Sequence, residues 1–182
     1  MSINRLTTLA FSLYSNKICG KQEIGEKPTI EQLTIRIWQK KLNVSSIKMF
    51  EHYENKKWKN KDGMPLKDID SAIGRFNQFV YFKRKTGDLR KEYDILLKTN
   101  EWKEYAKTVH QHYHNECQRC HKKGNLEVHH MRYYFAKGDM NIPARLPWEY
   151  PLEEVLSLCH TCHEKEQHVQ CYSEHERLSG FK

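Results

Sequence analysis

Apolar side chains return every three or four positions through much of the first half of the chain. Between residues 30 and 42 this spacing follows Thr29, a suitable helix N-cap, and Gln32 stands at the third helical position of a capping box. Similar patterns predict helices over residues 46–57 and 66–82. We therefore expect the front of the molecule to be a small all-α unit.

The second half begins in the same way and then changes. A helical pattern covers residues 89–115, with Thr99 as a cap that would restart the helix. Residues 126–133 then alternate as in a strand, residues 152–159 lead back beside it, and residues 161–171 have a helical pattern. The predicted fold is mainly α with a small α+β domain at its C-terminal end.

Charge divides the chain in the same place. Residues 1–90 carry 18 basic and 9 acidic groups, whereas residues 91–182 carry 13 and 14. Ten of the eleven histidines lie in the second half. Because neutralising phosphates drives nucleic-acid binding, we expect a basic binding region, residues 1–88, followed by a site-bearing region, residues 89–182. The charged, turn-containing stretch 83–88 is the candidate boundary, and it contains the candidate phosphate-binding residues Lys83, Arg84 and Lys85.

Four of the six cysteines form two Cys-x-x-Cys pairs. They are Cys117, Cys120, Cys159 and Cys162. A two-residue spacing chelates a metal better than it forms a disulfide, and four thiolates favour a closed, structural zinc site, with an iron centre as the weaker alternative. Cys19 and Cys171 receive no role. No stretch approaches the roughly 18 apolar residues that span a bilayer, and residues 6–13 fit a short amphipathic helix better than a secretion signal. We expect a soluble protein of a reducing compartment.

The cysteine pairs bracket Leu126-Glu-Val-His-His130, and the second pair continues into His163. Together with Pro147-Trp-Glu-Tyr-Pro151 and the approach to Cys117 from Trp102, these residues resemble the HNH endonucleases, in the form braced by two Cys-x-x-Cys pairs. The resemblance covers about residues 93–168. It implies a ββα-metal nuclease domain, a DNA substrate, and the cytoplasm of a bacterial or phage-infected cell.

The resemblance also implies roles for single residues. His130 would be the general base that activates water, and His129 and His163 would bind a catalytic divalent ion such as Mg²⁺ or Mn²⁺. A further family ligand usually lies four residues after His163, whereas here the histidine is His168, five residues on. The middle asparagine of the family signature, which ties the loop, is replaced by Glu154.

Several expectations stay open at this point. The basic residues Arg132, Lys137 and Arg145 flank the histidines and either steady phosphates or are solvated cations. The aromatic residues between 76 and 82 either stack on bases or belong to the core. The chain is expected to be a nuclease, but a zinc-braced DNA-binding or adaptor protein that does not cut is the alternative. The front helices would then hold DNA or dock a protein partner. Oligomeric state and cleavage specificity are not indicated.

Overall fold

The computed structural model describes residues 27–66, 68–76, 79–166 and 170–173. Three helices form the front of the molecule: α2 (Ile30–Gln39), α3 (Ser46–Asn55) and α4 (Ile69–Phe76). The predicted capping box is present, because Thr29 Oγ1 accepts from the Gln32 amide at 3.2 Å and Gln32 Oε1 accepts from the Thr29 amide at 3.0 Å. The expected helix over residues 6–13 lies outside the described residues.

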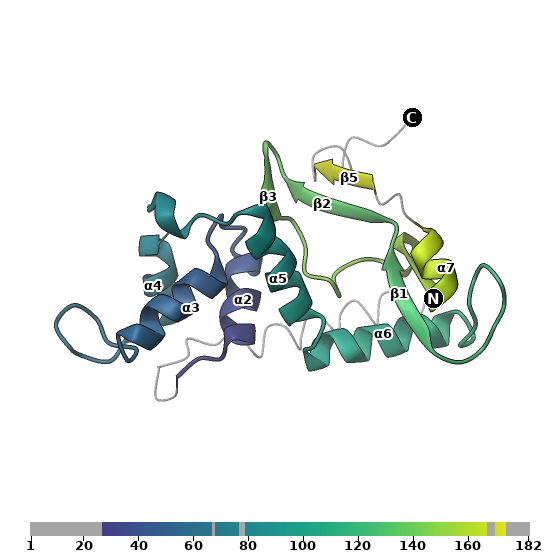
Figure 1. Cartoon of the computed structure of the whole chain (residues 1–182), viewed down its shortest axis with the longest axis horizontal. Coiled ribbons are helices and arrows are strands. Elements are labelled where there is room, and N and C mark those ends of the chain that lie inside the picture. The colour runs from purple at the N-terminus through teal and green to yellow at the C-terminus, as the bar shows by residue number, and fades with distance from the viewer. Residues whose placement is uncertain (1–26, 67, 77–78, 167–169, 174–182) are drawn as a thin grey trace, which may run out of the picture.

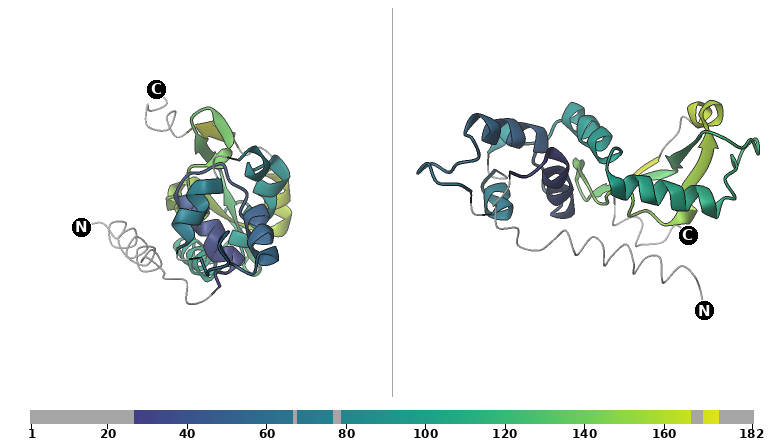
Figure 2. Two further views of the ribbon diagram at one scale, coloured as in Figure 1. Left: turned by 90° about the vertical axis from the view of Figure 1, so that its left-hand side faces the viewer. Right: turned by 90° about the horizontal axis from the view of Figure 1, so that it is seen from below.

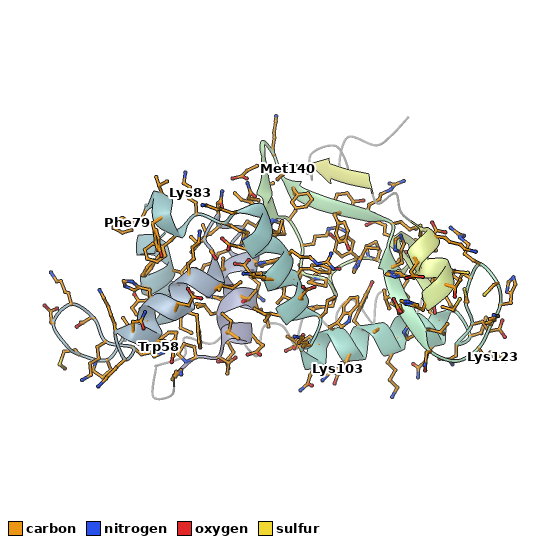
Figure 3. All side chains as sticks on the ribbon, in the orientation of Figure 1. Trp58, Phe79, Lys83, Lys103, Lys123 and Met140 are labelled. Carbon is orange, nitrogen blue, oxygen red and sulfur yellow. The ribbon has the colours of Figure 1, made fainter. Side chains whose placement is uncertain are left out.

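The single helix expected over residues 66–82 is divided into α4 and a 3-10 turn, η1 (Val80–Phe82). Phe76 and Phe82 both point into the front core, with ring centroids 4.2 Å apart. In one continuous helix, residues six apart lie about 240° round from each other. The break therefore allows both rings to be buried on the same side. It leaves Phe79 and Tyr81 exposed, and Figure 3 shows Phe79 projecting from the molecule near Lys83.

Two further helices connect the front to the rest. Helix α5 (Thr86–Leu96) ends before α6 (Asn100–His112), and Thr99 caps α6 by accepting from the Trp102 amide. The expected interruption is thus confirmed. Because α5 begins at Thr86, the candidate boundary after residue 88 falls inside its first turn. In Figure 1, α5 lies in the middle of an elongated molecule, between the front helices and the strands.

The C-terminal part contains the predicted hairpin. Strand β1 (Leu126–His130) pairs antiparallel with β4 (Val155–Cys159), which follows η2 (Leu152–Glu154) and leads directly into α7 (His160–Lys165). A second sheet has the order β3 (Asp139–Pro143), β2 (Arg132–Ala136), β5 (Gln170–Ser173), with β2 and β5 parallel. The helix expected to run to residue 171 is therefore too long, because residues 170–173 pair with β2 instead. The fold is mixed α+β.

Two helices pack against the hairpin β1–β4, one on each face. Val128 and His130 lie opposite Ser157 and Val155, and this face packs on α6. The alternate residues form the other face, which packs on α7 and on the cysteines; they are Glu127, His129, Leu156 and Leu158. Adjacent strand residues point to opposite faces, so the two neighbouring histidines are separated by the sheet.

Helix α2 contributes to two cores. Leu33 and Ile37 are fully buried among α3, α4 and η1, whereas Ile35 and Trp38 pack in the cluster that contains Leu96 and the hairpin. The right-hand view of Figure 2 shows α2, in purple, with other front helices on one side and the strand-containing part on the other. No helix of the described residues is long and apolar enough to cross a membrane.

Candidate functional site

Both cysteine pairs meet beside the hairpin. One ligand atom from each of Cys117, Cys120, Cys159 and Cys162 lies within 4.8 Å of all the others. The Sγ atoms of Cys120 and Cys159 are 3.6 Å apart. Four sulfurs around zinc, each at about 2.3 Å from the ion in tetrahedral geometry, lie about 3.8 Å apart. The four side chains are therefore close enough to hold one metal ion with small shifts of the sulfur atoms, and four thiolates leave no ligand position for substrate.

The electrostatics of this cluster call for a cation. Burial raises the pKa of the Cys117 thiol, but hydrogen bonds from the backbone of Cys159, Arg119 and Cys120 outweigh it and lower that pKa to about 6. Burial, followed by hydrogen bonds with the other cysteines, raises the pKa of Cys162 to about 12. A negative charge on one cysteine sulfur thus opposes the ionisation of the next cysteine. A bound divalent ion removes this repulsion and allows all four to ionise.

Gln118 fastens the first cysteine pair to the hairpin. Its amide donates to the Ser157 carbonyl at 2.9 Å, and its side-chain oxygen accepts from the Ser157 amide at 3.0 Å. Ser157 is fully buried, and its hydroxyl bonds His110 Nδ1 at 2.9 Å. The pair is therefore held in a fixed position relative to β4 by protein contacts as well as by any metal.

His129 and His163 meet on the same side of the hairpin. His129 projects from β1 and His163 from α7, and their ring centroids are 5.1 Å apart. Burial, and secondarily the nearby His163, lowers the pKa of His129 below its ordinary value. His129 is therefore neutral at pH 7, which is the form that binds metals. The structure thus brings together two of the three residues expected at the catalytic ion.

Glu127 orients the second histidine. It is two residues before His129, hence on the same face, and its Oε2 is 3.0 Å from His163 Nδ1. Its Oε1 accepts from His160 Nδ1 at 2.8 Å, which raises the pKa of His160. The carboxylate oxygen beside Nδ1 favours the tautomer that carries its proton on Nδ1 and leaves the lone pair of His163 on Nε2. Glu127 was not among the residues predicted for the site, although strand alternation places it beside His129.

His130 lies on the other face, among aromatic rings. It is 2% exposed, and its ring stacks on Trp102 with centroids 5.6 Å apart. Nε2 is 2.8 Å from the Pro147 carbonyl, which only accepts, so Nε2 carries the proton. Nδ1 is then the acceptor for the Tyr93 hydroxyl at 3.1 Å. Burial lowers the pKa of His130 to about 4, so the ring is neutral, but neither nitrogen reaches solvent in this conformation.

Glu154 ties the loop between β1 and β4. Its carbonyl accepts from the Met131 amide at 2.9 Å. Its carboxylate accepts from the Tyr134 hydroxyl at 2.9 Å and pairs with Arg145 at 3.3 Å. A carboxylate at this position therefore joins both ends of the loop, although by different contacts from those of an amide.

The expected phosphate-binding residues divide into two groups. Lys83, Lys85 and Lys137 are exposed. Arg145 is engaged with Glu154 and lies over the Tyr134 ring, and Arg132 is half-buried. Arg84 is buried and pairs with Glu92, both side chains being fully enclosed. Arg84 is therefore removed from the candidate phosphate ligands, because reaching a phosphate would leave Glu92 as an unpaired buried charge.

His168 lies outside the described residues. Within the described part of the chain, only the four cysteines bring three or more ligand atoms together, so a second ion would take two histidine ligands and complete its shell with water and phosphate oxygens. In comparisons with known proteins, no family model, no curated protein and no solved structure matches this chain.

Proposed function

We propose that the protein is a metal-dependent endonuclease of the HNH type, with structural zinc on the four cysteines and a catalytic divalent ion on His129 and His163. The observation that carries the proposal is the convergence of these two histidines from β1 and α7, with Glu127 setting the tautomer of one of them. Cys159 ends β4 opposite Leu126, the first residue of β1, and Cys162 is next to His163 in α7, so the frame and the histidine pair form one unit.

The chain's residues divide the work as follows. His129 and His163 present neutral imidazole nitrogens on one side of the hairpin, where a divalent ion would stabilise the negative charge that develops on the phosphate and on the leaving oxygen. Glu127 holds His163 in place through Nδ1. His130, which is neutral and hydrogen-bonded to Pro147, has the protonation state of a base.

For His130 to take a proton from water, the Tyr93 hydroxyl must leave Nδ1 or pass the proton on. The Tyr93 hydroxyl also lies 3.2 Å from the Tyr133 hydroxyl, so two hydroxyl groups in series lead away from His130. We therefore propose that DNA binding displaces Tyr93 from His130. Catalytic hydrogen bonds often reach their final geometry only in the complex with substrate.

Plasmid cleavage tests the proposal. Zinc-loaded protein is incubated with supercoiled plasmid and Mg²⁺, Mn²⁺ or Ni²⁺, alongside His129→Ala and His163→Ala. The control is His112→Ala, which replaces an exposed histidine of α6. We expect nicking by the wild type and the control, and a loss of at least about 100-fold in both ligand variants. If the wild type cuts under none of the metals, the nuclease proposal is wrong.

The enclosure of His130 favours a second candidate, a zinc-braced DNA-binding protein that does not cut. In that case His130 is a core residue, and His130→Phe would leave DNA affinity unchanged in a gel shift. A nuclease would lose cleavage with the same substitution while retaining affinity. The two candidates therefore differ in the comparison with the wild type: a nuclease cuts as the wild type and not as His130→Phe, whereas a binding protein cuts in neither form.

A further inference from the structure

An aromatic cavity of about 230 Å³ lies between α5 and β2, on the His130 side of the hairpin. Its walls come from α2, α5, β2 and the loop before β4. The aromatic residues that line it are Trp38, Tyr93, Tyr133, Tyr134, Phe135 and Tyr150. Figure 1 shows that these elements lie at the centre of the molecule, between the front helices and the hairpin. The cavity is smaller than the pockets that take drug-sized ligands, and it suits a single planar ring system.

The charges around the cavity select among planar occupants. Arg90 and Arg145 also line it, and no aspartate or glutamate is among the described residues of its lining. Aromatic cages bind quaternary ammonium groups elsewhere, but a cation here would meet guanidinium groups. Arg145 is paired with Glu154, and Arg90 pairs with Asp94 at 3.4 Å across an exposed surface, so Arg90 is the cation that can turn to an anion at the rim. Arg90 is on the exposed side of α5, with 81% of its side chain accessible. An apolar planar group attached to an anion fits this arrangement.

The cavity shares its inner wall with the surroundings of His130. The Tyr93 hydroxyl is hydrogen-bonded to His130. The ring centroids of Tyr133 and Tyr150 lie 5.5 and 4.5 Å from that of the His130 imidazole. A ligand that moves Tyr93 or Tyr133 therefore changes the hydrogen bonding of His130 directly. The cavity is connected to the one candidate catalytic group that the resting conformation encloses.

We propose that this cavity binds a single unpaired nucleobase of the DNA strand, with Arg90 contacting an adjacent phosphate. The proposal rests on the proposed function and names its substrate class: DNA with a bulged, mismatched or single-stranded nucleotide. Base stacking on aromatic side chains supplies the affinity, and an already unpaired base enters at the lowest cost. Entry displaces Tyr93, so an unpaired base both binds and exposes His130.

Binding of labelled oligonucleotides tests the inference. The full-length, zinc-loaded protein is titrated, without a catalytic metal, into a short duplex with one bulged base and into the same duplex fully paired. Fluorescence anisotropy reports both affinities at one salt concentration. We expect the wild type to prefer the bulged duplex by on the order of tenfold.

Two variants change the cavity in opposite ways. Phe135→Leu removes a stacking ring, and Leu89→Trp fills the space from α5. Both should lose most of the preference while binding paired duplex as the wild type does. Met64→Leu is the control, because Met64 is 62% exposed and is not part of the lining. Thermal melting of each variant confirms that it is folded.

The outcomes separate this inference from the nuclease proposal. Absence of a preference in the wild type, or a preference that survives both cavity variants, overturns the inference even if plasmid is cut. A preference abolished by both variants supports it even if no metal permits cutting, and the nuclease proposal then fails alone. Binding of the cavity to an aromatic side chain of a protein partner would leave the two duplexes indistinguishable and count against the inference.

Discussion

The partners of the two ring nitrogens determine whether each histidine can bind a metal or accept a proton. The Glu127 carboxylate on β1 lies 3.0 Å from Nδ1 of His163, which favours metal binding by that histidine through Nε2. The Pro147 carbonyl and the Tyr93 hydroxyl occupy both nitrogens of His130. Neighbouring residues of one strand thus have different environments, and their functions follow from the hydrogen-bond partners more than from the residue type.

Replacing Glu127 should weaken metal binding by His129 and His163 without removing a ligand. Glu127→Gln keeps the shape of the side chain but removes the carboxylate charge that supports His163. We expect a 10- to 100-fold higher metal requirement for cleavage, measured by titrating Mn²⁺. Glu153→Gln, on the exposed turn before β4, is the control and should match the wild type. An unchanged Mn²⁺ dependence would show that Glu127 does not orient a ligand.

His52 should make stability depend on pH. It packs against the rings of Tyr53, Phe76 and Phe82, and burial, then the charge of Lys56, lowers its pKa below 6.5. As pH falls, the unfolded chain takes up the proton first, so stability present above about pH 6.5 is lost below it. Urea unfolding at pH 7.5 and 5.5 should show a larger loss for the wild type than for His52→Gln. Equal losses would contradict this.

For the helices, residues close together in the sequence were sufficient to predict where a helix begins. The caps at Thr29 and Thr99 depend on residues three positions away, so the sequence predicts them directly. The pairing of β1 with β4 was also predicted, because the two cysteine pairs fix which segments must meet.

Contacts between distant residues were not predictable in this way. Strand β3 is short and ends at Pro143, β5 falls where the sequence has a helical pattern, and β5 is a strand because it lies beside β2. The enclosure of His130 depends on Tyr93, 37 residues earlier. A strand pattern shows that His129 and His130 face opposite ways, but not which face is covered by aromatic rings.

The cysteine cluster should control the stability of the whole hairpin and α7 unit. We expect one zinc per chain by elemental analysis, and chelation should lower the thermal midpoint by at least about 10 °C. Cys162→Ala should reproduce this effect. His121→Gln changes an exposed residue next to Cys120 and should leave the midpoint unchanged. A midpoint insensitive to chelation would mean that the cysteines do not hold a structural ion.

For the whole molecule, the front helices and the site-bearing part are joined by a buried polar junction. Glu92 on α5 accepts from Trp38 Nε1 at 2.9 Å, from the Ser46 amide at 2.7 Å and from Arg84 Nε at 2.7 Å. Arg84 in turn donates to the carbonyls of Leu42 and Asn141. The basic front region is thus packed into the same structure as the strands.

Breaking this junction should be costly. Glu92→Ala leaves the Arg84 guanidinium buried without its counter-ion, so we expect the free energy of unfolding to fall by about 3–5 kcal/mol. Urea denaturation measures the change. Asp94→Ala, on the exposed side of the same helix, should change it by less than about 0.5 kcal/mol. Similar values for the two variants would indicate that the buried pair contributes nothing beyond a surface one.

Because α2 packs in two cores, it limits which sequence changes this protein can accept during evolution. An insertion of one residue in the helix turns every later side chain by about 100°, so Ile37 and Trp38 would both leave the cores they now fill. Substitutions within α2 change one core at a time, whereas a change in its length disrupts both. We therefore expect natural variants to differ in the composition of this helix and to keep its length.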